Sequence, residues 1–241
     1  MNRFPLLSYD IREGAMIKIL IYNNESNAFE TYWLELNDSM PYVYNNSMLV
    51  SEFLGSSTSN VAWSSVDALK AWNETRIAYG NPIPFNYAFK RIWEGGHGRQ
   101  SQHYAGVSFD VGQALNNQQR LNIYEIANDL DVWSYVEPLY LTPTWVHFDK
   151  RYGTPACSAG YPTLKINDKG IYVLVLQDAL NAIGYNTYEL DGIFKEQTLN
   201  AVKQFQSDNA LASDGIVGCA TWTLLTQKAV GIGLTSTVLN P

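Results

Sequence analysis

Two short stretches of the sequence carry residues that could bind a metal ion. His103 and Asp110 lie seven positions apart with Gly106 between them, and the residues after the glycine alternate between apolar and polar. This alternation predicts a loop with His103, a turn at the glycine, and a strand with Asp110 on its polar face. Residues 145–149 alternate in the same way around His147. If the two strands lie side by side, the two imidazoles and the carboxylate converge, and such a set with one open position is typical of catalytic zinc.

The simpler interpretation is that these histidines are ordinary polar or core residues. The chain has 3 histidines, and two of them, His103 and His147, fall in or beside alternating strands, which favours a common role. The third, His97, lies in a glycine-rich loop that lacks the spacing of a phosphate-binding loop. We interpret His97 as a loop residue without a catalytic role; a spare ligand or a substrate contact is the alternative.

A family resemblance supports the metal interpretation. The residues from Ser101 to Asp110 resemble the S-x-H-x-x-G-x-A-x-D signature of the zinc D-Ala-D-Ala carboxypeptidase family, with Ser108 in place of alanine. This family belongs to the wider group of lysostaphin-like and hedgehog-like metallopeptidases. The W-x-H that ends at His147 resembles the strand with its third ligand. The resemblance implies a Zn²⁺ ion held by His103, Asp110 and His147 in a small α+β fold.

The general base is not carried over by the resemblance. Zinc activates a water for attack on a peptide carbonyl, and another group must take the proton. Many relatives have Glu or Asp three residues before the last histidine and others have histidine two residues before it; this chain has Thr144 and Trp145 there. Two carboxylates remain as catalytic candidates. We prefer Glu137, which ends a strand just upstream, over Asp149, which lies about 7 Å along the strand from the histidine.

A cation that holds substrate is also implied by the resemblance. Relatives end the preceding strand with S-G-Y-R, whereas the matching segment here runs from Tyr87 to Lys90 and is followed by Arg91. Neighbouring residues of a strand point to opposite faces, so only one of the two cations can serve. We prefer Arg91 because its planar guanidinium suits a carboxylate, with Lys90 as the alternative.

Periodicity predicts the elements that position these residues. Ser64 or Ser65 is expected to cap a helix that Gly80 ends. Residues 1–15 show no pattern and are interpreted as a loose arm, and the role of residues 1–60 stays open. The predicted strands are 16–22, 29–36, 47–53, 107–111, 132–137 and 145–149, and the predicted helices of this part are 64–79 and 122–130. We predict a small antiparallel-sheet zinc peptidase domain over residues 1–150.

The composition changes after residue 150. Glycine, proline and serine make residues 151–161 a predicted linker. Three amphipathic helices follow, at 170–183, at 196–207 and from 221, with two similar Asp-Gly turns between them. Their residues resemble the common peptidoglycan-binding domain, including D-G-x-F, T-x-x-A-V-x-x-F-Q and D-G-I-V-G. We therefore predict an all-α three-helix domain over residues 162–230 that binds bacterial peptidoglycan.

Composition limits the possible partners and the cellular location of the protein. The chain of 241 residues is 46% hydrophobic with a net charge of −7, which disfavours a nucleic-acid partner. No apolar run is long enough to span a bilayer, so no membrane partner is expected. The N-terminus lacks a signal peptide, so we predict synthesis in the cytoplasm and release to the wall by lysis or holin-type export. Cys157 and Cys219 are predicted to be free buried thiols, with one disulfide as the alternative.

These patterns together predict a monomeric zinc metallopeptidase that cleaves stem peptides of peptidoglycan. D-Ala-D-Ala carboxypeptidase and L-Ala–D-Glu endopeptidase activities both occur among the relatives, and a phage endolysin or a sporulation enzyme would fit the architecture. The alternative is a non-catalytic wall-binding protein with a structural metal. A general protease is disfavoured because the second domain indicates one polymer.

Overall fold

The structure, a computed structural model, describes residues 14, 16–158 and 160–233, so almost all of the predicted N-terminal arm lies outside it. A first sheet contains β1 (Ile17–Asn23), β2 (Ala28–Leu34) and β3 (Val61–Ser65) in the order β2-β1-β3. The central strand β1 is apolar and mostly buried, and it pairs antiparallel with β2 and parallel with β3. The first two strands confirm the sequence prediction. The parallel partner β3 was not predicted, and its last two residues, Ser64 and Ser65, were assigned to the start of the helix.

The segment expected to form a strand at residues 47–53 is instead the site of a short helix, α1 (Val50–Leu54). Its buried residues Val50, Phe53 and Leu54 follow helical spacing, which a short apolar run does not distinguish from a strand. The Glu52 carboxylate accepts a hydrogen bond from the Leu49 backbone N–H at 2.8 Å and closes the first turn. The predicted strand is therefore wrong.

The second sheet has the antiparallel order β4-β5-β7-β6, in which β4 is Phe85–Tyr87, β5 is Ser108–Val111, β6 is Tyr135–Val136 and β7 is Val146–Asp149. In the central pair, Asp110 of β5 lies directly opposite His147 of β7. The predicted side-by-side arrangement of the two strands is confirmed. The opposite face is apolar: Phe109 and Phe148 are fully buried and contact Trp133.

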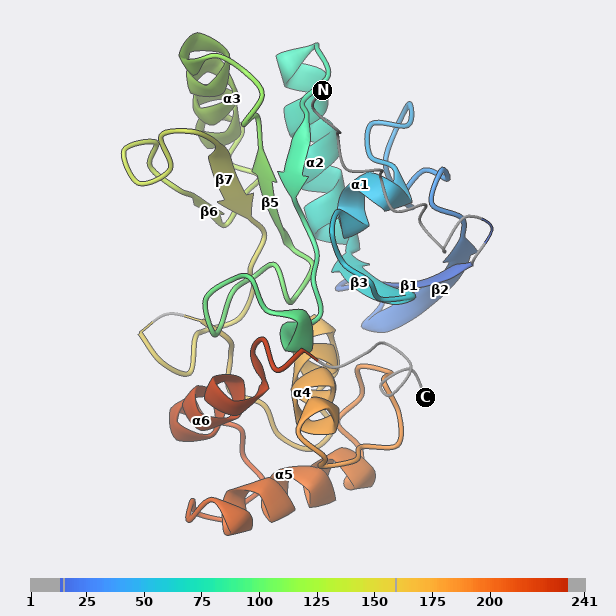
Figure 1. Ribbon diagram of the computed structural model, residues 1–241, viewed down its shortest axis with the longest axis vertical. Helices are drawn as coiled ribbons and strands as arrows, with labels where there is room; N and C mark the ends of the chain where they lie inside the picture. The colour runs from blue at the N-terminus through green and yellow to red at the C-terminus, as the bar shows by residue number, and fades with distance from the viewer. Residues whose placement is uncertain (1–13, 15, 159, 234–241) are drawn as a thin grey trace, which may run out of the picture.

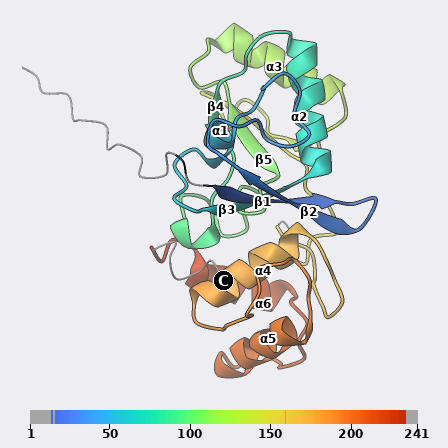
Figure 2. The same cartoon turned by 90° about the vertical axis from the view of Figure 1, so that its right-hand side faces the viewer.

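Two helices cover the apolar side of the second sheet, α2 (Val66–Tyr79) and α3 (Asn117–Asp129), seen together at the top of Figure 1. Helix α2 begins directly after β3, where the Ser65 hydroxyl accepts a hydrogen bond from Ala68 N–H at 3.2 Å. It ends at Gly80 in the left-handed conformation, with φ at 73°. Both predicted ends of the helix are confirmed. Figure 2 shows the first sheet between these helices and the C-terminal ones.

The C-terminal part contains the three predicted helices, α4 (Ile171–Ala182), α5 (Glu196–Asp208) and α6 (Cys219–Ala229). The sequence repeat has a structural basis in two buried glutamines. The Gln177 side chain donates a hydrogen bond to the Asp191 carboxylate at 2.9 Å and accepts one from the Gly192 backbone N–H at 2.9 Å. Gln206 does the same with Asp214, at 3.1 Å, and with its following glycine at 2.9 Å. Each glutamine therefore fixes the Asp-Gly turn that follows its helix.

The predicted linker is fastened to the C-terminal helices. Cys157 and Cys219 form a disulfide, so the prediction of free thiols is wrong. The chain turns back at an antiparallel bridge between Pro155 and Pro162, and a second bridge joins Leu164 to Val217, close to Cys219. Residue spacing does not reveal these contacts. The 3₁₀ helix η1 (Ile92–Glu94) packs against α4, as the centre of Figure 1 shows, and one hydrophobic core runs through both parts.

The predicted α+β class with a helical C-terminal domain agrees with this architecture, except that the mixed first sheet was not foreseen. Among the residues described, no helix combines the length and the hydropathy that a membrane crossing requires.

Candidate metal centre and adjoining pocket

The loop with His103 is held by the first sheet. Gly106 adopts a φ of +69°, and a Cβ on it would lie 1.9 Å from the Trp63 carbonyl oxygen. Its carbonyl accepts a hydrogen bond from the Ser64 hydroxyl at 2.7 Å, and the Trp63 indole donates to the Tyr104 carbonyl at 3.0 Å. Strand β3 thus presses directly on the loop. This gives the N-terminal residues, whose role the sequence left open, a structural function as the support of His103.

His103 itself is buried and its ring orientation is fixed. Its Nδ1 lies 2.9 Å from the Ala88 carbonyl oxygen, so Nδ1 carries the proton and donates it there. The other nitrogen, Nε2, lies 3.3 Å from Asp110 Oδ2. In the neutral imidazole, Nε2 and the carboxylate oxygen are both acceptors, so a proton or a cation must stand between them to make this contact favourable.

Asp110 joins the two strands of the site. Its Oδ1 lies 2.6 Å from His147 Nδ1, the residue opposite it in the sheet. Burial disfavours the ionised carboxylate, but the interactions with His103 and His147 outweigh burial and lower the pKa of Asp110 well below the ordinary range. His147 is also 3.5 Å from Asp149 through its Nε2. Burial lowers the pKa of His147, but the bonds to the two carboxylates raise it to about 9.

The third histidine belongs to the same cluster. The ring of His97 stacks on that of His103 with centroids 4.1 Å apart. Candidate ligand atoms of His97, His103 and Asp110 all lie within 4.8 Å of one another. Burial and the neighbouring His103 lower the pKa of His97 to about 3, so it is a neutral imidazole. The small number of histidines is the one signal for this placement that the sequence contains.

This donor set fits a zinc ion. Neutral imidazoles and a carboxylate are ligands that zinc accepts. The donor group within 4.8 Å consists of His97, His103 and Asp110, and His147 is joined to it through its contact with Asp110 at 2.6 Å. Two buried polar atoms in the cluster, His97 Nε2 and Tyr87 Oη, have no hydrogen-bond partner among the residues described. Orphaned polar atoms at one place indicate that something absent from the coordinates satisfies them.

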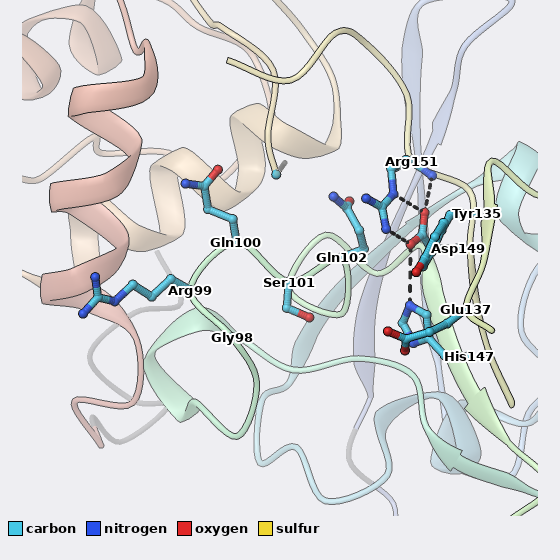
Figure 3. A pocket seen from close by; sticks show the side chains of 11 residues that line it. Gly98, Arg99, Gln100, Ser101, Gln102, Tyr135, Glu137, His147, Asp149 and Arg151 are labelled. Carbon is cyan, nitrogen blue, oxygen red and sulfur yellow. Dashed lines mark hydrogen bonds and ion pairs between the residues drawn. The ribbon is translucent and has the colours of Figure 1, made fainter. Parts of the chain in front are cut away.

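A pocket of about 440 Å³ opens beside His147 and is the site's access to solvent. Figure 3 shows that Glu137, Tyr135 and Arg151 form its wall around His147, with Arg99 and Gln100 across from them. The pocket is therefore lined by two carboxylates, Glu137 and Asp149, next to a candidate ligand and by cations on either side.

The two candidate bases have different environments. Asp149 is fully buried, and its Oδ1 accepts a hydrogen bond from Arg151 Nε at 2.7 Å while Oδ2 meets a second nitrogen of the same guanidinium. Burial raises the pKa of Asp149, but Arg151 and His147 more than offset this and lower it. Glu137 is only half-buried, on the pocket wall, and its backbone N–H donates to the His147 carbonyl at 2.9 Å. Glu137 has the freer carboxylate.

The predicted role of Arg91 in holding substrate is wrong. Arg91 is fully buried and pairs with Asp178 of α4, with 2.7 Å between nitrogen and oxygen. Its guanidinium also lies over the rings of Trp63 and Trp93, at 5.2 and 5.7 Å from their centroids. It turns inward because Asp178 arrives from a distant part of the sequence. Lys90, the alternative, is half-buried and lies 5.9 Å from the centroid of Tyr87.

Comparison with known proteins adds information about the C-terminal part. Residues 170–225 match the family model described as "Putative peptidoglycan binding domain". This part of the chain is a peptidoglycan-binding domain. The match lies within the predicted boundaries of 162–230 and includes both glutamine-fixed turns.

Similar proteins cover the chain only in part. The "Uncharacterized protein in bpoA1 3'region" of Kitasatospora aureofaciens is 42% identical over 73 residues, which are 30% of this chain and 62% of that protein. A solved structure of a peptidoglycan-binding protein from Clostridioides difficile, in complex with glutamine hydroxamate, shares 38% identity over 27% of this chain and 40% of its own, with a TM-score of 0.26. The chain thus spans less than two thirds of either relative.

Proposed function

We propose that this protein is a zinc-dependent peptidase that cleaves stem peptides of bacterial peptidoglycan and is held on the wall by residues 162–230. The observation that carries the proposal is the cluster in which Asp110 contacts His103 and His147 at 3.3 and 2.6 Å beside an open pocket. The peptidoglycan-binding domain supports the choice of polymer.

In this proposal His103, Asp110 and His147 hold the zinc ion. When bound, zinc supplies Lewis-acid polarisation of the scissile carbonyl and activation of water. His103 is already oriented for binding, since Ala88 accepts the proton of the other ring nitrogen. His147 must bind as a neutral imidazole, so the proton that it shares with Asp110 is displaced on binding. Asp149 positions the His147 ring and is itself fixed by Arg151.

Glu137 is the group that we assign to proton transfer. Its carboxylate lies on the pocket wall beside His147, where it can accept a proton from the attacking water and return it to the leaving amine (Figure 3). Asp149 is less suited to this role because both of its oxygens are engaged by Arg151. A carboxylate that already accepts two charge-assisted hydrogen bonds is a poor proton acceptor.

The cations around the pocket match an anionic peptide. Arg99 is exposed on one wall, and the Arg151 side chain is 31% exposed on the other, above the ring of Tyr135. Stem peptides carry carboxylates in side chains and at the terminus, so these guanidiniums can hold the substrate. Lys90 is a further cation near the cluster. Which of the carboxypeptidase and L-Ala–D-Glu endopeptidase reactions takes place depends on the bond placed at the metal.

The test is digestion of purified peptidoglycan by the zinc-loaded protein, with new amino termini counted and released muropeptides identified by mass. Asp110→Ala should abolish cleavage, and Glu137→Gln should lower kcat by about 10²- to 10⁴-fold with unchanged zinc content. Asp149→Asn is the matched carboxylate control. If Glu137→Gln retains full activity while Asp149→Asn loses it, Asp149 is the base. If the wild-type protein binds wall and zinc but releases no amino termini, the proposed peptidase activity is wrong.

A second candidate is a non-catalytic wall-binding protein with a structural metal. It is favoured by Thr144, exposed where many relatives carry a catalytic acid, and by the two carboxylates that flank His147. In that case Asp110→Ala leaves wall binding intact as long as the variant folds, and no stem peptide is cut by either protein.

We further propose that the protein works outside the reducing cytoplasm, on the wall, after release by lysis or holin-type export. The Cys157–Cys219 disulfide supports this setting, because such bonds persist in oxidising compartments.

A further inference from the structure

We propose that His97 is an additional ligand of the cation bound by His103 and Asp110. The proposal rests on the metal site of the proposed function and adds to it a donor outside the three residues that the sequence motif supplies. Candidate donor atoms of His97, His103 and Asp110 lie within 4.8 Å of one another, close enough for one ion to reach them all after small shifts.

The ring of His97 is held toward the cluster rather than toward solvent. It stacks on His103 at 4.1 Å, with 26° between the planes, and meets the edge or face of Tyr87 at 4.0 Å. Its backbone is anchored on both sides by Tyr104, whose hydroxyl accepts from His97 N–H at 3.1 Å and donates to His97 O at 3.0 Å. Tyr104 is fully buried, so this anchor is part of the core.

The loop is built so that the imidazole reaches this place. Gly95 and Gly96 have φ values of +69° and +97°, in the region that favours glycine. A Cβ on Gly96 would lie 3.1 Å from Tyr87 Oη, and a Cβ on Gly95 would lie 2.6 Å from the backbone of Gly231. The two glycines permit a tight turn that brings His97 against His103 and Tyr87.

One ring nitrogen of His97, the buried Nε2, lacks a hydrogen-bond partner among the residues described. Buried polar atoms are nearly always satisfied by protein or by a bound species, and the groups next to this one are an imidazole and a carboxylate. A structural histidine would make a hydrogen bond at this nitrogen; a metal ligand leaves its lone pair open in the metal-free state.

The test measures metal affinity and not activity. Zinc affinity is obtained by competition with a chromophoric chelator, and the ligand field by the visible spectrum of the Co²⁺-loaded protein. His97→Ala and His97→Gln should each weaken zinc binding by at least about tenfold and change the cobalt spectrum. Asn86→Ala is the control, since Asn86 is exposed on the neighbouring strand, bonds Gln113 and lies outside the cluster, so both readouts should stay unchanged.

The outcomes separate this inference from the proposed function. If both His97 variants, folded by near-ultraviolet circular dichroism, bind zinc as the wild type does with the same cobalt spectrum, His97 is not a ligand. If neither His97 variant folds, the wild-type protein is tested instead by the ¹⁵N shift of His97 Nε2, which must move when zinc is added. If wild-type protein binds no zinc, the inference fails. If it binds zinc through His97 but cuts no stem peptide, only the proposed activity fails.

Discussion

The buried ion pair between Arg91 and Asp178 gives a sharp test of how the two parts of the chain are joined. Both side chains are essentially inaccessible, at 1% and 0% exposure, and lie 2.7 Å apart. Asp178 also accepts from Ile92 N–H at 3.2 Å, and Arg91 donates to Ser59 Oγ at 3.0 Å. The pair therefore connects α4 to the segment that leads into the loop with His97 and His103.

We expect Asp178→Ala to lower the free energy of unfolding by about 3–5 kcal/mol, because it leaves the buried guanidinium without its carboxylate. Domains are stable by about 5–15 kcal/mol, so this is a large fraction of the total. In a protein of this size the melting temperature should fall by roughly 10 °C. The change is measured by urea unfolding under oxidising conditions, followed by tryptophan fluorescence and by circular dichroism.

Two comparisons make the result interpretable. The double variant Arg91→Met with Asp178→Leu removes both charges and should recover most of the lost stability. The exposed pair Lys195–Glu189, at 2.5 Å and 43% and 53% exposure, is the surface control; Lys195→Ala should change stability by less than about 1 kcal/mol. The reasoning is refuted if Asp178→Ala unfolds at the wild-type urea concentration, or if the double variant is less stable than the single one.

Three further changes test other parts of the structure. Replacing Cys157 and Cys219 by serine removes a disulfide that joins residues 62 positions apart. Because the unfolded chain gains conformational entropy, the free energy of unfolding should fall by about 4 kcal/mol, and an unchanged urea midpoint would contradict this. Gly106→Ala should prevent native folding, because its Cβ would meet the Trp63 carbonyl at 1.9 Å; native near-ultraviolet circular dichroism would refute it. Gln177→Leu should lower the free energy of unfolding by about 2 kcal/mol, because the backbone N–H groups of Asp191 and Gly192 lose their acceptor. Thermal unfolding measures the change, and an unchanged melting temperature would show that this turn does not depend on Gln177.

The sequence specified those features whose signals are local. Alternating side chains placed Asp110 and His147 on polar faces of two strands, and the structure pairs them directly. Helical periodicity, the cap at Ser65 and the glycine at residue 80 fixed α2. The Asp-Gly turns are visible as a repeat in the sequence, and in the structure each buried glutamine binds the turn 15 residues or fewer further on. Side-chain direction and backbone hydrogen bonding over a few residues are enough to determine such elements.

Long-range contacts decided the rest, for a physical reason. Whether Arg91 faces a pocket or the core depends on Asp178, which lies on a helix 87 residues away. Cys157 and Cys219 are 62 residues apart and pair only because the chain folds back beside α6. His97 reaches His103 and Asp110 through a glycine turn fixed by Tyr104 and Tyr87, and none of these packing contacts leaves a periodic mark in the sequence. Sequence pattern set which residues share a face; the packing of distant segments set which of those faces meet.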